Sequence, residues 1–422
     1  MIKVIVIGGG FGGINLANGL AGKEPFLVTV VDRNNYNFFP PLLYQIATGY
    51  LEPSNICYPF RRIWRNKGNI RFHMAEFISV NLAEKKVILS TGELPYDYLV
   101  FATGTKTNYF GLENVQRNAL PMKTLNDALD LRNYLLQIME TATKTKDANE
   151  RKKLLTFVVA GAGPTGVEVS GMLAEMEKKV VKKDYPELVG KDYELHIYLV
   201  DAAGKVLAPM SEKSQKDSFD ALTKLGVEIK LGMQIKDYKD DKVYFSTGES
   251  IETKTLVWAA GVTCSTFDGI PQEYYGRGKR LVVDEYNEVK GLQGIYAIGD
   301  TCLQTSDERF PNGHPQVAQP AIQQGALLAK NLVALEASQS RKPFSYYDKG
   351  SMAIIGWNKA VVDLPKPRMH FKGFMAWLTW IFVHLMFLIN YRNRVRTIYN
   401  WATAYFTKDQ TLRMIIRPKS KQ

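Results

Sequence analysis

Short apolar runs alternate along the chain with stretches in which apolar residues recur at helical spacing. Residues 4–7 and 27–31 are such runs near the amino end, and residues 155–159 and 195–200 repeat the arrangement further along. Runs of this length that are apolar at nearly every position are typical of strands covered on both faces, as in a parallel sheet with helices on either side. The pattern predicts an α/β fold built from two strand–helix domains.

A glycine-rich loop follows the first run of each pair and opens a predicted helix. The loops read Gly-Gly-Gly-Phe-Gly-Gly at 8–13 and Gly-Ala-Gly-Pro-Thr-Gly at 161–166. Glycines at such a turn let the backbone approach a pyrophosphate, and the helix N-terminus offers its free N–H groups to the phosphates. The sequence therefore predicts two Rossmann-like domains and two bound dinucleotides, an arrangement suited to passing electrons between them. The expected contact residues are Gly8, Gly10, Phe11, Gly12 and Gly13, and in the second loop Gly161, Gly163, Thr165 and Gly166.

An acidic residue ends the second predicted strand of each half. Asp32 follows residues 27–31, and Asp201 follows residues 195–200. A carboxylate in this place accepts hydrogen bonds from ribose hydroxyls and disfavours a 2′-phosphate. Because no basic residue follows Asp201 until Lys205, the second site is predicted to prefer NADH over NADPH.

The two halves also resemble each other beyond the glycine loops. Residues 86–93 lead to 98–104, and residues 242–249 lead in the same way to 256–261. An ordered repeat of this length indicates a duplicated domain. Residues 294–300, a predicted strand ending in Gly-Asp, have no counterpart, and we place them in the first domain, which becomes discontinuous. The predicted boundaries are 1–117 and 266–345 for the first domain, 118–265 for the second, and 346–422 for a C-terminal region.

Composition excludes several classes of protein. The chain has 422 residues, enough for two or three domains with substantial cores. Its cysteines, Cys57, Cys264 and Cys302, form no CxxC or CxxxxC pair, which argues against a disulfide scaffold, a zinc site or a short-range redox dithiol. We predict no metal site. The first predicted strand starts at Ile2, which leaves no room for a signal peptide, and a cytoplasmic location is expected.

The positive charge is concentrated at the C-terminal end. Of a net charge of +12, almost all comes from residues 365–422, where Asp409 is the only acid. The same region contains the apolar run 374–389, flanked by basic residues and tryptophans. This combination suits an anionic membrane surface better than nucleic acid, and the run is short for a spanning helix. A monotopic attachment through residues 365–422 is predicted, and a buried or dimer-interface helix is the alternative.

These features resemble the two-dinucleotide-binding flavoproteins and, within them, the type II NADH:quinone oxidoreductases. Three stretches carry the resemblance: residues 37–49, residues 161–168, and residues 318–325 with the pattern Ala-Gln-x-Ala-x-Gln. The tail, with Trp377, Trp380, His384 and Trp401, is similar to the membrane-binding end of that family. The resemblance implies an enzyme of the respiratory chain that oxidises NADH through FAD, reduces a membrane quinone and pumps no protons. It also implies a peripheral location on the cytoplasmic face of the cell membrane.

The resemblance also assigns residues to roles. FAD would lie on the first glycine loop, and NADH on the second with its nicotinamide against one flavin face. Quinone would reach the flavin from the opposite side near Gln319 and Gln323, and Glu168 would position substrate or relay protons. The further residues implied for FAD are Asp32, Arg33, Phe77, Thr103, Gly104, Asp300, Ala318 and Gln319.

Simpler interpretations stand beside these roles. Glu168 could be an acid stabilised by the helix dipole in a first turn, and Gln319 and Gln323 could share a solvent-exposed helix face. His314 is interpreted as a surface residue. A sulfide:quinone oxidoreductase and a non-respiratory flavoprotein with a binding or signalling role are the alternative functions. The sequence leaves open whether the quinone is menaquinone or ubiquinone, in which order the substrates bind, and whether the chain forms a homodimer.

Overall fold

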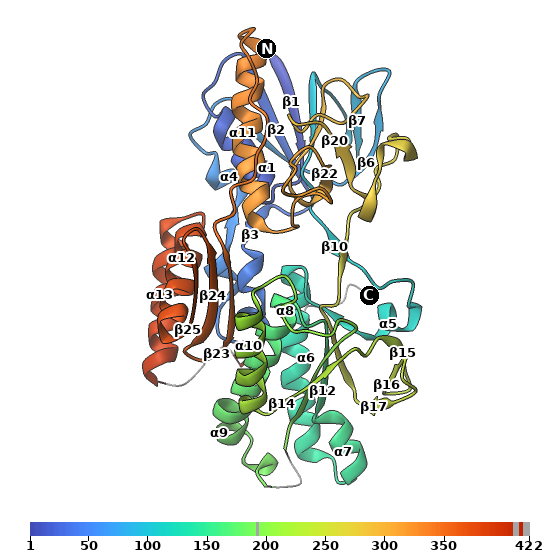
Figure 1. The fold of residues 1–422 in the computed structure, drawn as a ribbon, viewed down its shortest axis with the longest axis vertical. Helices are drawn as coiled ribbons and strands as arrows, with labels where there is room; N and C mark the ends of the chain where they lie inside the picture. Colours follow the sequence, from blue (N-terminus) through green and yellow to red (C-terminus); the bar gives the residue numbers. More distant parts are fainter. Residues whose placement is uncertain (191–193, 408–412, 417–422) are drawn as a thin grey trace. The chain divides into compact units, whose positions relative to one another are not determined.

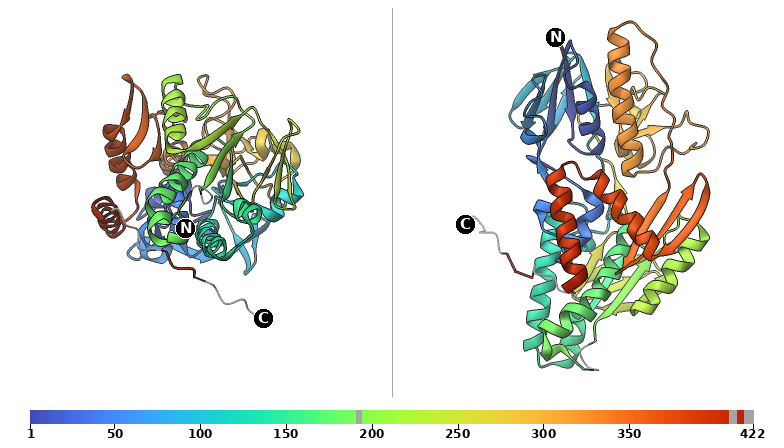
Figure 2. Two further views of the ribbon diagram at one scale, coloured as in Figure 1. Left: turned by 90° about the horizontal axis from the view of Figure 1, so that it is seen from below. Right: turned by 90° about the vertical axis from the view of Figure 1, so that its left-hand side faces the viewer.

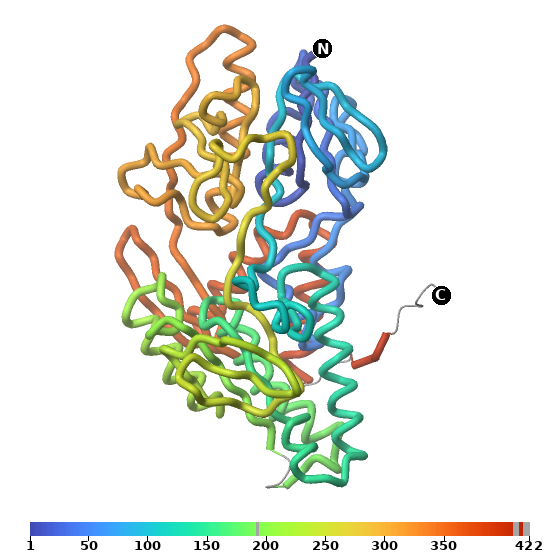
Figure 3. The backbone as a smooth tube through the Cα atoms, turned by 90° about the vertical axis from the view of Figure 1, so that its right-hand side faces the viewer, coloured from blue at the N-terminus to red at the C-terminus, as the bar shows by residue number. Residues whose placement is uncertain are grey.

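The computed structural model describes residues 1–190, 194–407 and 413–416 (Figure 1). The chain divides into two compact units. The first unit is assembled from three separate stretches of chain, residues 1–38, 58–106 and 262–348, which appear in blue to cyan and in yellow to orange (Figure 3). The second contains residues 39–57, 107–261 and 349–422.

The first unit is built on a five-stranded parallel sheet. Its strand order is β21 (Ile295–Ala297), β9 (Tyr98–Phe101), β1 (Ile2–Ile7), β2 (Phe26–Asp32) and β5 (Ile70–Met74). The segment 294–300, which has no counterpart in the second half of the sequence, supplies the edge strand β21 beside β9. Val4 and Val6 of β1 are fully buried, in keeping with a strand covered on both faces.

Different elements cover the two faces of this sheet. Helices α1 (Phe11–Leu20) and α11 (Ala318–Glu336) pack on one face through a common apolar core. They approach so closely that a Cβ added to Gly325 would collide with the Gly12 carbonyl oxygen. The antiparallel strands β6 (Phe77–Asn81), β7 (Lys86–Leu89) and β8 (Gly92–Pro95) cover the other face.

The second unit repeats this plan. Its parallel sheet has the order β11 (Leu120–Pro121), β18 (Thr255–Trp258), β12 (Thr156–Ala160), β13 (His196–Asp201) and β14 (Val227–Leu231). Helices α8 (Pro164–Met176) and α10 (Glu212–Leu225) pack on it, and α6 (Leu125–Lys144) lies beside β11. The antiparallel strands β15 (Ile235–Lys239), β16 (Lys242–Phe245) and β17 (Ser250–Glu252) cover its other face. The predicted α/β fold with two Rossmann-like sheets is confirmed.

The C-terminal region contains a sheet that the sequence did not predict. Strands β23 (Ser351–Gly356), β24 (Lys359–Pro365) and β25 (Arg368–Gly373) form an antiparallel meander before helices α12 (Phe374–Phe387) and α13 (Tyr391–Thr407) (Figure 2). Strand β23 packs on α8 so tightly that a Cβ added to Gly171 would collide with the Ile355 carbonyl oxygen. The predicted helical end is therefore present, preceded by a small sheet that fixes it to the second unit.

Candidate active site

The first glycine loop joins β1 to α1 and is shaped by contacts that only glycine allows. Gly8 has a φ of +104°, and a Cβ added to Gly13 would collide with the Gly8 carbonyl oxygen. A Cβ added to Gly10, by contrast, would meet no atom within 4 Å. The loop is thus closed on the protein side and open at the N-terminus of α1, where a pyrophosphate would approach the free N–H groups.

The second loop has the same construction between β12 and α8. Gly161 has a φ of +101°, a Cβ added to Gly166 would collide with the Gly161 carbonyl oxygen, and Gly163 faces open space. Pro164 occupies the first turn of α8, where a backbone N–H is not needed within the helix. Thr165 is exposed beside it. Both loops therefore fit a dinucleotide in the same way.

The two strand-end acids hold their own glycine loops. Asp32 accepts hydrogen bonds from the N–H groups of Gly9 and Asn34, both at 2.8 Å. Asp201 accepts equivalent bonds from Ala162 and, at 2.6 Å, from Ala203. Each carboxylate oxygen has lone pairs left for ribose hydroxyls, so a nucleotide contact and the loop contact are compatible. Sequence reasoning had assigned these acids only the nucleotide contact.

Burial changes the acidity of Asp32. Loss of water around the carboxyl group raises its pKa, and the hydrogen bonds from Asn34 and Gly9 and the charge of the neighbouring Arg33 oppose that shift. Arg33 itself is exposed at the end of β2. A ligand that donates hydrogen bonds to the Asp32 carboxylate would favour its charged form in the same way as the backbone donors do.

Two segments far apart in sequence meet at the carboxyl edge of the first sheet. The N–H of Gly104 donates to the Thr301 hydroxyl at 3.2 Å, and the Thr103 and Thr301 hydroxyls lie 3.4 Å apart. The Thr105 hydroxyl donates to Asp300 at 3.3 Å. The predicted residues Thr103, Gly104 and Asp300 are therefore brought together.

Two buried amides support this edge, and sequence reasoning did not single them out. Asn37 donates from Nδ2 to the Gly9 carbonyl oxygen at 2.8 Å. Gln324 accepts a hydrogen bond at 2.7 Å from the N–H of Gly299, the residue that precedes Asp300 in the sequence. Both lie within the stretches 37–49 and 318–325 that carry the family resemblance, and that resemblance was the one signal pointing to them.

The aromatic residues expected beside FAD differ in their surroundings. Phe77 packs edge-on against Phe101 at 5.6 Å and against Phe267 at 5.5 Å between ring centroids. These contacts place Phe77 against the apolar core of the first unit, and its contact with the adenine stays a prediction. Phe11 starts α1 and is half-buried.

Glu168 is a buried carboxyl group in the second unit. It is the fifth residue of α8 and is 9% exposed, so it differs from an acid stabilised at a solvated helix end. Burial raises its pKa well above the ordinary range, and a hydrogen bond with the backbone of Ile354 opposes the shift only in part. A carboxyl group held in this way retains its proton to a higher pH than an exposed carboxyl group does, which suits a proton donor.

Tyr44 is a second buried group of this unit, on the short helix α2 (Leu43–Ala47). Burial and the charge of Glu168 raise the pKa of its hydroxyl. Its oxygen accepts a hydrogen bond from Gln45 Nε2 at 2.9 Å, and Gln45 Oε1 accepts one from Trp401 of α13 at 2.6 Å. The stretch 37–49 therefore connects the C-terminal helices to the surroundings of Glu168.

Gln319 and Gln323 lie on the first two turns of α11, in the first unit. Ala318, also predicted at the flavin ring, is the first residue of this helix. Gln319 Oε1 accepts a hydrogen bond from the Tyr346 hydroxyl at 3.3 Å. Gln323 pairs with the backbone of Tyr347, donating from Nε2 to its carbonyl oxygen at 2.9 Å and accepting from its N–H at 3.0 Å. The two glutamines thus have side-chain partners and do not form a bare solvent-exposed face.

His314 is buried, which corrects its interpretation as a surface residue. It is 2% exposed, and its ring lies among Phe310, Phe344 and Tyr346 with centroid distances of 5.1–5.8 Å. Its Nε2 lies 3.3 Å from Asp307 Oδ2. The contact forms because the loop between Asp307 and His314 folds back on itself. Nothing in the spacing of these two residues predicts that the loop folds in this way.

Helices α12 and α13 expose a largely apolar surface. Phe382 and Phe406 are 65% and 81% exposed, and further exposed apolar residues are Phe374, Met375, Leu378, Met386, Phe387, Tyr391, Val395, Ile398 and Tyr399. Trp380, expected beside this surface, is instead buried against His384 and Trp401. Over the ranges that the structure covers, no helix is both long and apolar enough to cross a membrane. The basic residues Lys408, Arg417, Lys419 and Lys421, together with Asp409, lie outside the described residues.

The inward face of α13 is polar. Asn393 donates to the Cys57 carbonyl oxygen at 3.0 Å, and Asn400 donates to Asn55 Oδ1 at 3.2 Å. Thr397 is fully buried between them, and Trp401 reaches Gln45. Four residues along the inward face of α13 therefore bind the segment 45–57 by hydrogen bonds, namely Asn393, Thr397, Asn400 and Trp401.

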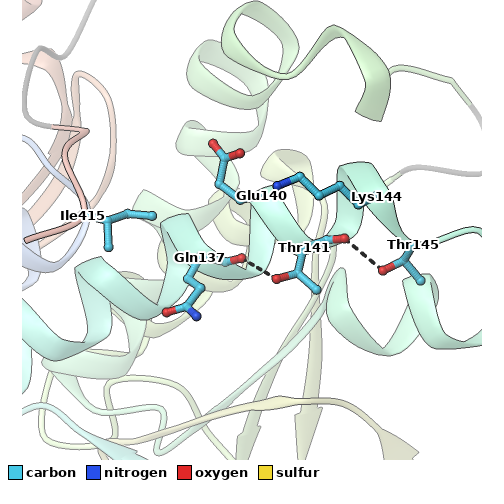
Figure 4. A pocket seen from close by; sticks show the side chains of 6 residues that line it. All are labelled: Gln137, Glu140, Thr141, Lys144, Thr145 and Ile415. Carbon is cyan, nitrogen blue, oxygen red and sulfur yellow. Dashed lines mark hydrogen bonds between the residues drawn. The ribbon is translucent and has the colours of Figure 1, made fainter. Parts of the chain in front are cut away.

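A separate shallow pocket lies along α6 and does not involve any predicted site residue (Figure 4). It is lined by Gln137, Glu140, Thr141, Lys144, Thr145 and Ile415. Thr141 and Thr145 donate to backbone carbonyls of their own helix, so their hydroxyls are already used.

Comparison with known proteins shows which families this chain matches. Residues 2–325 match the family described as pyridine nucleotide-disulphide oxidoreductase, and residues 348–408 match the NDH2 C-terminal domain. Type II NADH:quinone oxidoreductase NdhA of Mycobacterium tuberculosis is 35% identical over 421 residues, covering 96% of this chain and 87% of that protein. The type II enzyme Ndh of the same organism is 33% identical over 420 residues, covering 96% and 88%.

Solved structures share the fold. The structure of NDH2 from Plasmodium falciparum in complex with NADH has a TM-score of 0.88 at 22% identity and covers 99% of this chain and 100% of that chain. The sulfide:quinone oxidoreductase of Aquifex aeolicus has a TM-score of 0.72 at 19% identity, covering 97% and 96%.

Proposed function

Because the chain belongs to the type II NADH:quinone oxidoreductases, we propose how its residues divide the work of FAD-dependent NADH oxidation and two-electron quinone reduction without proton pumping. When bound, FAD would supply the two-electron redox chemistry that links NADH to the quinone. The observation that carries the proposal is the twin construction of the glycine loops, each with its own strand-end acid.

The first loop is proposed to hold FAD. Gly8, Gly10, Phe11, Gly12 and Gly13 would surround the pyrophosphate at the start of α1. Around them, Asp32 and Arg33 would face the adenosine, Phe77 the adenine, Thr103, Gly104 and Asp300 the pyrophosphate and ribityl chain, and Ala318 and Gln319 the flavin ring.

The second loop is proposed to hold NADH. Gly161, Gly163, Thr165 and Gly166 would bind its pyrophosphate at the start of α8, and Asp201 would accept hydrogen bonds from the adenosine ribose. The negative charge of Asp201 would repel a 2′-phosphate, which favours NADH over NADPH.

Glu168 and Gln319 are proposed to serve the quinone. Reduction of a quinone takes up two protons as well as two electrons, so a buried carboxyl group with a raised pKa is chemically suited to the task. The raised pKa of the buried Glu168 supports this role. Gln319 would orient the quinone carbonyl by a hydrogen bond from its amide. Menaquinone and ubiquinone share the carbonyl chemistry that these groups would recognise.

Stopped-flow measurements of flavin absorbance test the function directly. Purified protein carrying FAD is mixed with NADH, and the reduced protein is then mixed with a soluble quinone. We expect NADH to bleach the flavin and quinone to restore its colour. Flavin that NADH leaves oxidised, or that quinone fails to reoxidise, would contradict the proposal.

A sulfide:quinone oxidoreductase is not favoured. That chemistry uses paired redox cysteines, whereas Cys57, Cys264 and Cys302 form no disulfide within the part of the chain that the structure describes. Burial raises the pKa of the Cys57 and Cys302 thiols to about 12 and about 11, which opposes thiolate formation. Residues 348–408 also match the NDH2 C-terminal domain.

The exposed apolar surface of α12 and α13 is proposed to rest on an anionic membrane, as a peripheral attachment at the cytoplasmic face. Exposed basic residues, among them Arg392 and Arg396, border this surface and would meet lipid phosphates. Such an attachment would bring the enzyme to its lipid-soluble substrate. A second copy of the chain is the competing occupant of the same surface, and it would produce a homodimer without lipid.

A further inference from the structure

Residues 344–348 form a strap that runs past the start of α11. The strap has no regular secondary structure, yet Phe344 and Tyr346 are 5% and 2% exposed. Its backbone is bound at several points: the Tyr346 N–H lies 3.3 Å from Asp307 Oδ2, and Arg309 donates to the Tyr346 carbonyl oxygen at 2.8 Å. Asp307 and Arg309 also pair with each other at 2.9 Å.

The Tyr346 ring is fixed as firmly as its backbone. It lies 5.3 Å from the ring of Phe310 and 5.8 Å from that of His314, so the side chain has little freedom to rotate. Burial raises the pKa of the Tyr346 hydroxyl to about 12, which keeps its proton in place at any working pH. The hydroxyl is therefore a hydrogen-bond donor, and it donates to Gln319 Oε1 at 3.3 Å.

Gln323 acts on the same strap. Both ends of its amide bind the backbone of Tyr347, in the manner of a paired strand. Its side chain thereby ties α11 to the strap one turn beyond Gln319. Both ends of the Gln323 amide are thus engaged with the strap.

We propose that Tyr346 is a positioning residue for quinone reduction: held by the strap, its hydroxyl binds Gln319 Oε1 and fixes the orientation of the amide that meets the quinone carbonyl. This rests on the proposed function of Gln319. The strap contacts lie within one compact unit and join two parts of the chain that are distant in sequence, namely the start of α11 and the segment after its end.

The test uses the full-length protein with FAD and a soluble quinone. Tyr346→Phe removes the hydroxyl and keeps the ring within its aromatic surroundings. We expect the rate of flavin reoxidation by quinone to fall about three- to ten-fold, the usual effect of losing one neutral hydrogen bond. Flavin reduction by NADH should stay within about two-fold of the wild-type rate, since that step does not use the Gln319 amide.

Two further variants separate positioning from a general structural effect. Tyr347→Phe is the matched control: its ring is exposed and only its backbone binds Gln323, so both half-reactions should keep their rates. Adding Tyr346→Phe to Gln319→Leu should slow reoxidation no further than Gln319→Leu alone, because the two residues act as one unit.

Each alternative outcome has a distinct meaning. Wild-type flavin that quinone does not reoxidise would refute the proposed function itself. Reoxidation of Gln319→Leu at the wild-type rate would show that Gln319 does not act in quinone reduction, and it would overturn the positioning role of Tyr346 as well. If Gln319→Leu is slow but Tyr346→Phe is not, or if Tyr346→Phe slows both half-reactions equally, the positioning role alone is overturned. Multiplicative effects in the double variant would also overturn it.

Discussion

At the scale of single residues, Glu168 shows how burial changes chemistry. A carboxyl group whose pKa is raised in the folded protein binds its proton more tightly there than in the unfolded chain. Its contribution to stability is therefore fully present below the ordinary carboxyl pKa and is lost as pH rises through the raised value. Glu168→Gln keeps a neutral side chain at every pH. We expect its melting temperature to depend less on pH than that of the wild type. The melting temperature of the wild type should fall relative to that of the variant as pH rises above about 5.

Thermal unfolding of both proteins between about pH 5 and 8 measures this difference. Parallel curves would show that the pKa of Glu168 does not differ between the folded protein and the unfolded chain, and would contradict the raised pKa. The same variant should slow flavin reoxidation by quinone by about ten-fold or more if the carboxyl donates a proton. Asp307→Asn is unsuitable as a control because it would disturb the strap, whereas the exposed Glu212→Gln changes a carboxyl on the surface of α10.

Asp201 gives a second prediction at this scale. Asp201→Asn removes the negative charge while keeping an oxygen that can accept from the loop N–H groups. We expect the preference for NADH over NADPH, measured as the ratio of kcat/KM values, to fall about ten-fold because repulsion of the 2′-phosphate is lost. An unchanged ratio would remove Asp201 from this role. Asp201→Ala should lower the preference too, but it also releases the anchor of Ala162.

Glycine and acid positions could be predicted from sequence because backbone geometry at a strand–helix turn restricts them to few residue types. Gln324 and Tyr346 could not be predicted as supporting residues. Their partners, the N–H of Gly299 and the amide of Gln319, are brought to them only by the folding of distant segments. The family pattern around residues 318–325 pointed to the right stretch without distinguishing Gln324 from its neighbours.

At the scale of elements, the packing of β23 on α8 depends on Gly171. A side chain there would collide with the Ile355 carbonyl oxygen, so helix and strand would have to separate. We expect Gly171→Ala to destabilise the second unit by about 1–3 kcal/mol and to lower its melting temperature. Gly204→Ala is the control, since a Cβ there would meet no atom within 4 Å. Equal melting temperatures for the two variants would contradict a tight contact.

The strands of the C-terminal sheet escaped sequence analysis for a physical reason. Residues 353–356 of β23 and 360–362 of β24 are buried on both faces, so they lack the alternation of apolar and polar residues that marks a half-exposed strand. The parallel strands β1, β2, β12 and β13 were recognised because glycine loops or acids follow them. For those strands the apolar run and the neighbouring signal agreed, whereas no such signal accompanies β23 or β24.

At the scale of the whole molecule, the predicted attachment to lipid depends on the surface of α12 and α13. Phe382→Glu places a charge on that surface, and we expect binding to anionic vesicles to weaken about ten-fold or more, because a large apolar group is replaced by one that anionic lipids repel. Phe219→Glu on α10 is the matched control. Cosedimentation with vesicles measures binding, and light scattering without lipid detects a homodimer. Equal binding of the two variants would contradict the membrane assignment.

Helix α13 turns polar residues toward the protein and apolar residues outward, which is the reverse of the usual surface helix of a water-soluble protein. Asn393, Thr397 and Asn400 point inward, while Val395, Ile398 and Tyr399 point outward. If α13 were oriented by the usual rule that the apolar face of a helix meets the protein core, its inward and outward faces would be exchanged. In purification, the same inversion predicts that this protein needs an amphiphile once lipid is removed, and that chains without one will adhere to each other through their outer surfaces.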